Sequence, residues 1–331
     1  MNAPAPAAIG ARQKFLGGSD IGAILGVSPW KTPVDIYLEK TGQAIAAAPD
    51  PDKEKLFRRG KRLEPVVLEM LLEERGIETL VRNERYVDAV YPFMACEVDG
   101  EAIVEGEHVN LEAKTSHPFA RKFWGEEGTD EIDISYTAQA LWGMGITGRK
   151  RCIFAVLVGS DTLLTFEVKR DDELIAQMRA RAVAFWNDHV LAGVPPQPLN
   201  VFDTYKLFRK APSSKVEATP EVIALCQDLE RAKDDQRIAA ERELECKYEI
   251  GKYMLGASGI MLGSKGKLLP APDLKPGQHM LHVGGKPLLT LALIQQSRLD
   301  TARLAKERPE IAAEFQKSTT VFRFDRPRSK K

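Results

Sequence analysis

The sequence predicts an α/β fold, a mixed central sheet with helices on both faces, followed by an α+β extension. Helical segments and groups of strands follow one another in the order helices, strands, helix, strands, helix. Two apolar segments, RCIFAVLVG and TLLTFEVKR, flank a Gly159-Ser160-Asp161 turn and predict an antiparallel hairpin. The composition, 44% hydrophobic and 28% charged, is that of an ordinary globular protein. We therefore expect one large α/β domain over residues 13–200.

The first part of this domain reads as helices. Thr32 is a good N-cap and Pro33 suits the first turn of the helix that follows. Thr41-Gly42 and Gly76 are typical helix ends. After a flexible tail of residues 1–12, we expect helices over 20–25, 33–41 and 53–75, strands within 79–104 and 108–116, a helix over 134–146, strands within 151–159 and 162–170, and a helix over 172–192.

The character of the chain changes after GVPPQP, which closes the first domain. Thr219 can cap a long charged helix that runs to about Met254. A glycine-rich segment, short strands, a last helix over 301–316 and a basic tail follow. Residues 201–331 are therefore expected to form a C-terminal extension.

The bulk numbers exclude several classes of protein. Lys+Arg and Asp+Glu both number 47, which argues against a uniformly basic nucleic-acid binder but leaves a local basic groove possible. The four cysteines form no Cys-x-x-Cys pair, which argues against zinc or iron–sulfur sites and for reduced, mostly buried thiols. The N-terminal segment lacks the features of a signal peptide, and no segment is apolar enough to span a membrane. We expect a cytoplasmic protein.

The segment CEVDGEAIVEGEHVNLEAKTS carries the clearest chemistry. Asp99 is expected at the end of one strand beside a Gly100 turn, and Glu112 and Lys114 on one face of the next strand. Two neighbouring carboxylates favour a Mg²⁺ or Mn²⁺ ion between them. A lysine nearby can orient a water, so the set suits phosphodiester hydrolysis.

A solvated ion pair is the alternative for any Glu-x-Lys triplet. The triplet recurs at Glu167 and at Glu245. Glu245 falls in a predicted helix, where i and i+2 do not share a face, and Glu167 has no strand-ending aspartate before it. The context therefore favours Glu112.

Two further polar residues lie on apolar helix faces. Glu64 shares a face with Val67 and Leu68, where a metal cluster would give the carboxylate a partner. Equally, Glu64 can mark a helix start, with Pro65 as the first helical residue. Gln139 shares a face with Tyr136; it can reach a site or tie down a backbone group, and on its own the second role is the commoner.

The stretch GGSDIGAILG matches neither a P-loop nor a nucleophile elbow. Ser19 can cap the helix that follows. The same glycine-flanked helix start also offers free N–H groups to an anion, and both interpretations stay open.

Four motifs in this order resemble the YqaJ-like viral recombinase family, which includes phage lambda exonuclease: GGSDIGAILGVSPWKTPVDIYLEKTG, RGKRLEP, CEVDG…LEAKTS and YTAQALWGMGITG. The resemblance covers about residues 15–200. It implies a restriction-endonuclease-like PD-(D/E)xK core and Mg²⁺-dependent degradation of duplex DNA from its 5′ end, to leave a 3′ single strand. Mn²⁺ is expected to substitute.

Site residues follow from the resemblance position by position. Asp99, Glu112 and the Ala113 carbonyl would be metal ligands, and Lys114 would hold the attacking water. Glu64 would complete the acidic cluster. The remaining matches are Gln139, the family's glutamine after the core, and Ser19, its serine near the terminal phosphate.

The resemblance also implies a ring-shaped homotrimer that threads DNA and works with a single-strand annealing protein in phage or prophage recombination. Basic clusters could line such a channel, although a solvated helix face is the commoner role for such clusters. They comprise Lys53, Lys55, Arg58, Arg59, Lys61 and Arg62; Arg121 and Lys122; and Arg149, Lys150 and Arg151. An endonuclease on the same core, or a non-catalytic module that binds DNA ends or a partner, are the alternative functions.

Two departures from the family pattern are expected to matter. The spacing from Asp99 to Glu112 is long for a tight hairpin and suggests an expanded turn around EGEH. The segment GEEGTDEID is acidic where relatives often carry Ile-Pro.

Overall fold

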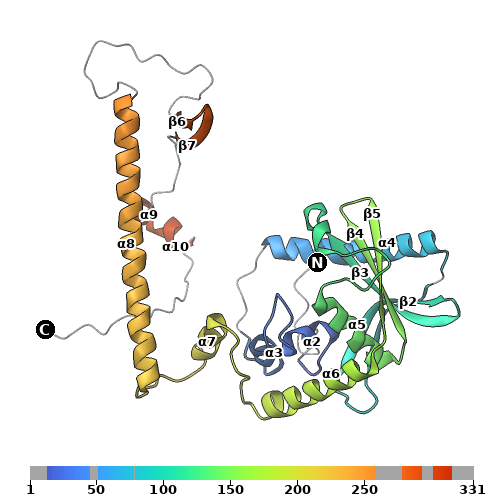
Figure 1. Ribbon diagram of the computed structural model, residues 1–331. Coiled ribbons are helices and arrows are strands. Elements are labelled where there is room, and N and C mark those ends of the chain that lie inside the picture. The colour runs from blue at the N-terminus through green and yellow to red at the C-terminus, as the bar shows by residue number, and fades with distance from the viewer. Residues whose placement is uncertain (1–12, 45–50, 78, 258–277, 293–300, 315–331) are drawn as a thin grey trace. The chain divides into compact units, whose positions relative to one another are not determined.

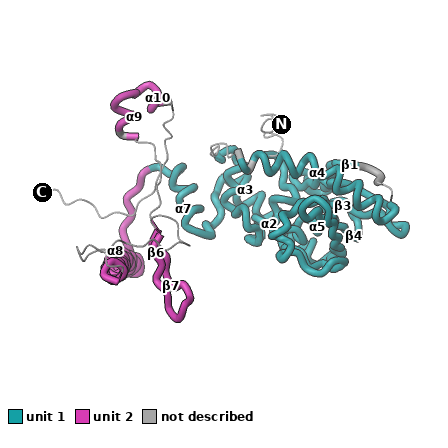
Figure 2. The backbone as a smooth tube through the Cα atoms, turned by 90° about the horizontal axis from the view of Figure 1, so that it is seen from above, with its two compact units in different colours: residues 1–212 teal, residues 213–331 magenta. Residues whose placement is uncertain are grey.

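The computed structural model describes residues 13–44, 51–77, 79–257, 278–292 and 301–314 (Figure 1). The chain divides into two compact units, Met1–Pro212 and Ser213–Lys331, which Figure 2 colours separately. Each unit is described by itself. The first unit extends past residue 200 because α7 (Val201–Phe208) is tied to its core: the buried Asp203 accepts a hydrogen bond from Thr32 Oγ1 at 2.8 Å.

The first unit is built on a five-stranded mixed sheet, as predicted. The strand order follows the chain, and every neighbouring pair is antiparallel except β3–β4, which is parallel. A crossover through α5 (Ile134–Thr147) joins that parallel pair. The strands are β1 (Thr79–Val87), β2 (Ala95–Val104), β3 (Glu107–Ser116), β4 (Arg151–Val158) and β5 (Thr162–Lys169).

Helices cover both faces of this sheet, which confirms the predicted fold class (Figure 1). On one face α4 (Pro51–Arg75) packs Leu68 and Leu71 against Leu111 and Ile153. On the other face α5 is central. Against it pack α2 (Gly18–Ile24) and α6 (Asp172–Phe185), which continues as a π-helical turn over Trp186–Leu191. Helix α3 (Pro33–Lys40) packs against α2 and that turn.

The second helix begins as its sequence predicts. Thr32 is the N-cap of α3, and its hydroxyl accepts the N–H of Asp35 at 3.3 Å while the Asp35 carboxylate accepts the N–H of Thr32 at 3.0 Å. This reciprocal pair is a capping box.

The hairpin that carries the carboxylates is tight, so the expected expanded turn was wrong. Its turn consists of Glu105 and Gly106, both with positive φ, 53° and 81°. The extra residues lengthen the two strands, which have ten residues each. Gly100 lies inside β2 rather than in a turn, because α4 approaches there: a Cβ at Gly100 would meet Leu68 Cδ1 at 3.2 Å.

Pro65 lies inside α4, so the alternative that Glu64 starts a helix was also wrong. Pro65 has no N–H to donate to the Lys61 carbonyl one turn earlier. The buried side chains of Val67, Leu68 and Leu71 hold the helix on the sheet despite that lost bond.

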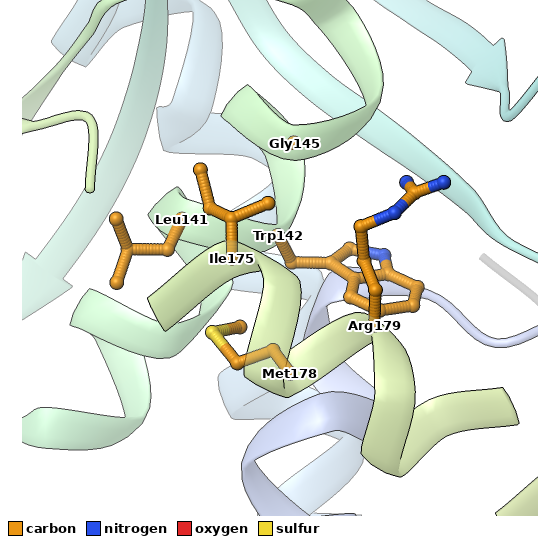
Figure 3. Close-up of a pocket in the computed structure, with 6 residues that line it drawn as sticks. All are labelled: Leu141, Trp142, Gly145, Ile175, Met178 and Arg179. Carbon is orange, nitrogen blue, oxygen red and sulfur yellow. The ribbon is translucent and has the colours of Figure 1, made fainter. Parts of the chain in front are cut away.

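The α5–α6 contact contains a narrow apolar gap, shown in Figure 3. The helices approach closely, since a Cβ at Gly145 would meet Ile175 Cγ2 at 2.9 Å. The gap is lined by Leu141, Trp142, Gly145, Ile175, Met178 and Arg179. None of these is a predicted site residue.

The second unit contains α8 (Pro220–Ala257), a helix of 38 residues. A hairpin of β6 (Gln278–Val283) and β7 (Lys286–Ala292) turns at Gly284-Gly285. The expected single last helix is two, α9 (Thr301–Glu307) and α10 (Pro309–Glu314), because Pro309 starts a new helix. Residues 258–277 and 315–331, with the glycine-rich segment and the basic tail, lie outside the described residues.

The cysteines are divided between the units. Cys96 and Cys152 are buried, and burial raises the pKa of the Cys96 thiol to about 12. Cys226 and Cys246 are exposed on α8. The expectation of mostly buried cysteines was therefore right for the two cysteines of the sheet and wrong for these two. Among the described helices, none combines the length and the apolarity that crossing a membrane requires.

Candidate active site

The site begins where the β2–β3 ladder ends. The paired residues stop at Gly100 and Leu111, so Asp99 and Glu112 stand next in register with no ladder pairing between them. In place of a strand partner, the Asp99 carboxylate accepts the N–H of Ala113 at 3.0 Å. The N–H and C=O of a strand residue point to the same side, so the Ala113 carbonyl also faces this opening.

Glu112 and Lys114 form an ion pair beside this opening. Lys114 Nζ lies 2.8 Å from Glu112 Oε2, and the Lys114 and Glu112 side chains are 18% and 6% exposed. Burial raises the pKa of the Glu112 carboxyl, the charge of Lys114 opposes that rise, and the charge of Asp99 adds to it. Burial lowers the pKa of Lys114, but the charges of Glu112 and Asp99 outweigh it and the net pKa is raised. The lysine therefore stays an ammonium, paired with Glu112 and near the charge of Asp99.

Gln139 joins this pair from α5. Its Nε2 donates to Glu112 Oε2 at 2.9 Å, so the same oxygen accepts from both Lys114 and Gln139. The commoner role, tying down a backbone group, therefore does not describe Gln139. With two donors on this one oxygen, the Glu112 carboxylate has little freedom to rotate.

Gly18 of the GGSD stretch packs against Gln139 of the site. A Cβ at Gly18 would meet Gln139 Cγ at 3.1 Å. The N-cap of α2 is Gly17, so the expectation that Ser19 caps the helix was wrong; Ser19 lies exposed in the first turn. Asp20 supplies the cap instead, because its Oδ2 accepts the N–H of Gly17 at 2.9 Å and also binds Lys40 Nζ at 2.6 Å.

The contact at Gly18 leads to a prediction. Gly18→Ala should push Gln139 by a few tenths of an ångström and lower the turnover number about tenfold, since small misplacements at a site are costly. Gly60→Ala is the matched control, because a Cβ there meets nothing within 4 Å. Equal turnover of the two variants at equal melting temperature would show that the Gly18–Gln139 contact is not needed.

Glu64 has other partners. Lys61 Nζ lies 2.9 Å from Glu64 Oε1 and also reaches Asn83 Oδ1 at 3.0 Å. Within the described part of the chain the structure does not bring Glu64 into contact with Asp99 or Glu112, and it contains no group of three or more His, Cys, Asp or Glu side chains placed to hold a metal.

The other two Glu-x-Lys triplets are elsewhere and differently paired. Glu167 Oε1 lies 3.4 Å from Arg151 Nη1, in a structural ion pair. Glu245 lies on the exposed helix α8. Neither Glu167 nor Glu245 lies next to an aspartate at the end of a strand pairing, as Glu112 does. This difference separates Glu112 from the other two triplets.

The predicted basic clusters differ in the solvent exposure of their side chains and in the partners that these side chains bind. Arg58, Arg59 and Arg62 are exposed on α4. Arg121 Nη1 donates to the carbonyls of Trp124 and Gly125, at 2.7 and 3.3 Å, while Lys122 lies exposed over the Phe123 ring. The side chain of Lys53 lies outside the described residues.

The third cluster does not form an open basic surface. Arg149 binds the buried Glu101 through both terminal nitrogens, at 3.0 and 2.9 Å. Arg151 pairs with Glu105, Glu107 and Glu167. The acidic side chains of the hairpin and β5 neutralise both arginines, so a channel-lining role for them is not supported.

Aromatic residues beside the lysine were not predicted as site residues. Lys114 Nζ lies 5.6 Å from the centre of the Tyr136 ring, which stacks on Trp124 at 5.6 Å and contacts Trp30 at 5.8 Å. Trp124 Nε1 donates to Ser116 Oγ at 3.0 Å. Tyr136 and Gln139 lie three positions apart on one face of α5. This spacing is the sequence signal from which Tyr136 could have been predicted to lie near the site.

Comparisons with known proteins agree with the motifs. Residues 9–150 match the model of the YqaJ-like viral recombinase domain. The chain is 28% identical over 315 residues to a Bacillus subtilis (strain 168) protein named "Uncharacterized protein YqaJ", covering 95% of this chain and 91% of that protein.

Two solved structures are also similar. An alkaline exonuclease from Laribacter hongkongensis aligns with 61% of this chain and 98% of its own, at a TM-score of 0.44 and 19% identity. A phage-related exonuclease from Haemophilus somnus 129PT aligns with 54% of this chain and 96% of its own, at a TM-score of 0.40 and 16% identity.

Proposed function

We propose that this chain, whose residues 9–150 match the model of the YqaJ-like viral recombinase domain, is a metal-dependent nuclease that degrades duplex DNA from 5′ ends and leaves a 3′ single strand. One observation carries the proposal: Asp99, Glu112 and Lys114 meet at the open end of the β2–β3 ladder. Holding two carboxylates together there costs free energy that a cation would recover.

The residues fit Mg²⁺, with Mn²⁺ as a substitute. Asp99 and Glu112 supply carboxylate oxygens, and the Ala113 carbonyl faces the same opening. Mg²⁺ commonly binds through one or two carboxylates together with substrate phosphates, so two carboxylates suffice without a closed protein cage. When bound, the ion would supply Lewis-acid stabilisation of the phosphate charge. Glu64 as a further ligand would require its pair with Lys61 to open.

Lys114 and Gln139 would then position the attacking water and the groups around the phosphate. Lys114, held by Glu112, orients the attacking water and stabilises negative charge near the phosphate. Gln139 fixes the rotation of Glu112 and thereby the place of Lys114. Water attacks the phosphorus atom between the first and second nucleotides and gives up a proton, and the bond to the 3′ oxygen of the terminal nucleotide breaks. That oxygen takes up a proton, the terminal nucleotide leaves, and the attacked phosphate stays on the DNA as its new 5′ phosphate.

DNA contacts and assembly are proposals of the same kind. The exposed arginines Arg58, Arg59 and Arg62 of α4, together with Arg121 and Lys122, would bind backbone phosphates, and Ser19 would lie near the 5′-terminal phosphate. A homotrimeric ring around the DNA, a single-strand annealing partner and a phage or prophage recombination system in the bacterial cytosol complete the proposal.

Polarity can be tested with duplexes labelled at one end. With Mg²⁺, a 5′ label should be released early as a mononucleotide, while a 3′ label should remain on long single strands. Chelation of the metal should stop both. Early release of the 3′ label with an intact 5′ end would contradict the proposed direction.

A further inference from the structure

An exposed tryptophan stands close to the candidate active site. Trp30 is 65% exposed, although indole rings are usually buried. Its ring contacts Tyr136 at 5.8 Å, tilted by 38°. The Tyr136 ring also lies next to Lys114 Nζ, so a single aromatic ring links Trp30 to the ammonium of Lys114.

The turn that carries Trp30 is held in place by hydrogen bonds. Ser28 Oγ accepts the N–H groups of Trp30 and Lys31, at 3.2 and 3.3 Å. The Gly22 carbonyl in α2 accepts the N–H groups of Val27 and Ser28, at 2.9 and 3.0 Å. The indole is therefore presented to solvent from a fixed backbone rather than from a loose loop.

Further aromatic rings pack against Tyr136 on its core side. Tyr136 stacks on Trp124 with an interplanar angle of 6°, and Trp124 in turn packs on the buried Phe166. Tyr136 also contacts the buried Phe154 at 6.2 Å. The row of rings thus runs from the core to the surface and ends at Trp30.

We propose that Trp30 and Tyr136 form an aromatic platform for the base of the nucleotide being cleaved from the DNA end. The inference rests on the proposed nuclease function. Tyr136 lies beside Lys114, which pairs with Glu112, and Trp30 contacts Tyr136. With the scissile phosphate at Asp99 and Glu112, the terminal nucleotide joined to it would place its base toward these two rings. Aromatic side chains beside a positive charge are the usual means of holding an unpaired base without reading its identity. The platform would hold the terminal base once it has left its partner strand.

The test combines two variants with two substrates. Trp30→Leu keeps an apolar side chain and removes the ring face, whereas Trp30→Phe keeps a ring face. The substrates are linear duplexes whose 5′-terminal nucleotide is either normal or abasic, digested with Mg²⁺. Melting temperatures should be unchanged, because the side chain is largely exposed.

On the normal duplex, Trp30→Leu should raise KM about five- to hundredfold, the range of a lost base–aromatic stack, and Trp30→Phe should recover most of the loss. On the abasic duplex the wild type should lose a similar factor and Trp30→Leu should lose nothing more. Kinetic parameters of Trp30→Leu equal to wild type on both substrates would overturn the platform.

An equal loss by Trp30→Leu on both substrates would also overturn it, and would indicate that Trp30 contacts another part of the DNA or a protein. In both cases the wild type still digests DNA, so the proposed nuclease function stands. Only a wild type that releases no nucleotides would remove that function as well.

Discussion

Glu112→Gln is expected to lower nucleotide release about 10³-fold while leaving the fold intact. The substitution keeps the shape of the side chain and its contact with Gln139, but removes the negative charge that a cation and Lys114 both require. Its amide can still accept a hydrogen bond from Lys114, and the charge of Asp99 remains near that ammonium. The loss of melting temperature should therefore be smaller than for a buried ion pair left with no second charge. Titration calorimetry should show that the variant also loses Mg²⁺ binding.

Glu167→Gln is the matched control, because it makes the same substitution in another Glu-x-Lys triplet of the same sheet. Glu167 pairs with Arg151 on a different part of the sheet from the carboxylate pair. Its activity should stay near that of wild type. Equal activity of the two glutamine variants would show that Glu112 does not belong to the catalytic machinery.

Lys40→Met is expected to destabilise the first unit by about 3–5 kcal/mol, the cost of breaking a buried ion pair from one side. The Lys40 and Asp20 side chains are only 4% and 8% exposed, so Asp20 would be left as an uncompensated buried charge. Asp20 also holds the N–H of Gly17 at the start of α2. Activity should fall too, because α2 packs on Gln139 through Gly18.

Lys31→Met is the control for this loss. Lys31 pairs with Glu39 of the same helix region, but the side chains are 41% and 38% exposed, and surface pairs contribute about 0–1 kcal/mol. All four tryptophans lie in the first unit, so urea unfolding followed by tryptophan fluorescence reports on that unit alone. Equal midpoints for the two variants would mean that the buried pair does not stabilise the fold.

Local sequence signals were enough for much of the fold. The apolar β4–β5 hairpin, the Thr32–Pro33 helix start and the long helix ending at Arg75 follow from spacing and turn chemistry, and the structure contains all of them. The meeting of Asp99 and Glu112 also follows, because an antiparallel hairpin fixes which residues stand opposite each other.

Other features depend on tertiary packing that a sequence pattern does not contain. Gly100 serves the approach of α4 and not a turn, and Pro65 is tolerated because the α4 face is buried. The cap of α2 comes from Asp20, whose charge is balanced by Lys40 twenty residues further along the chain. Arg149 forms an ion pair with Glu101 of β2, so this part of a basic sequence cluster did not become a basic surface.

The most direct test compares a linear duplex with a covalently closed circle, each incubated with wild-type protein with and without Mg²⁺. The account predicts nucleotide release and long single strands from the linear DNA only when the metal is present, and no cleavage of the circle, which offers no end to enter. Cleavage of the circle would indicate an endonuclease. Linear DNA left intact in the presence of Mg²⁺ would contradict the account and favour a non-catalytic DNA-end or partner-binding module.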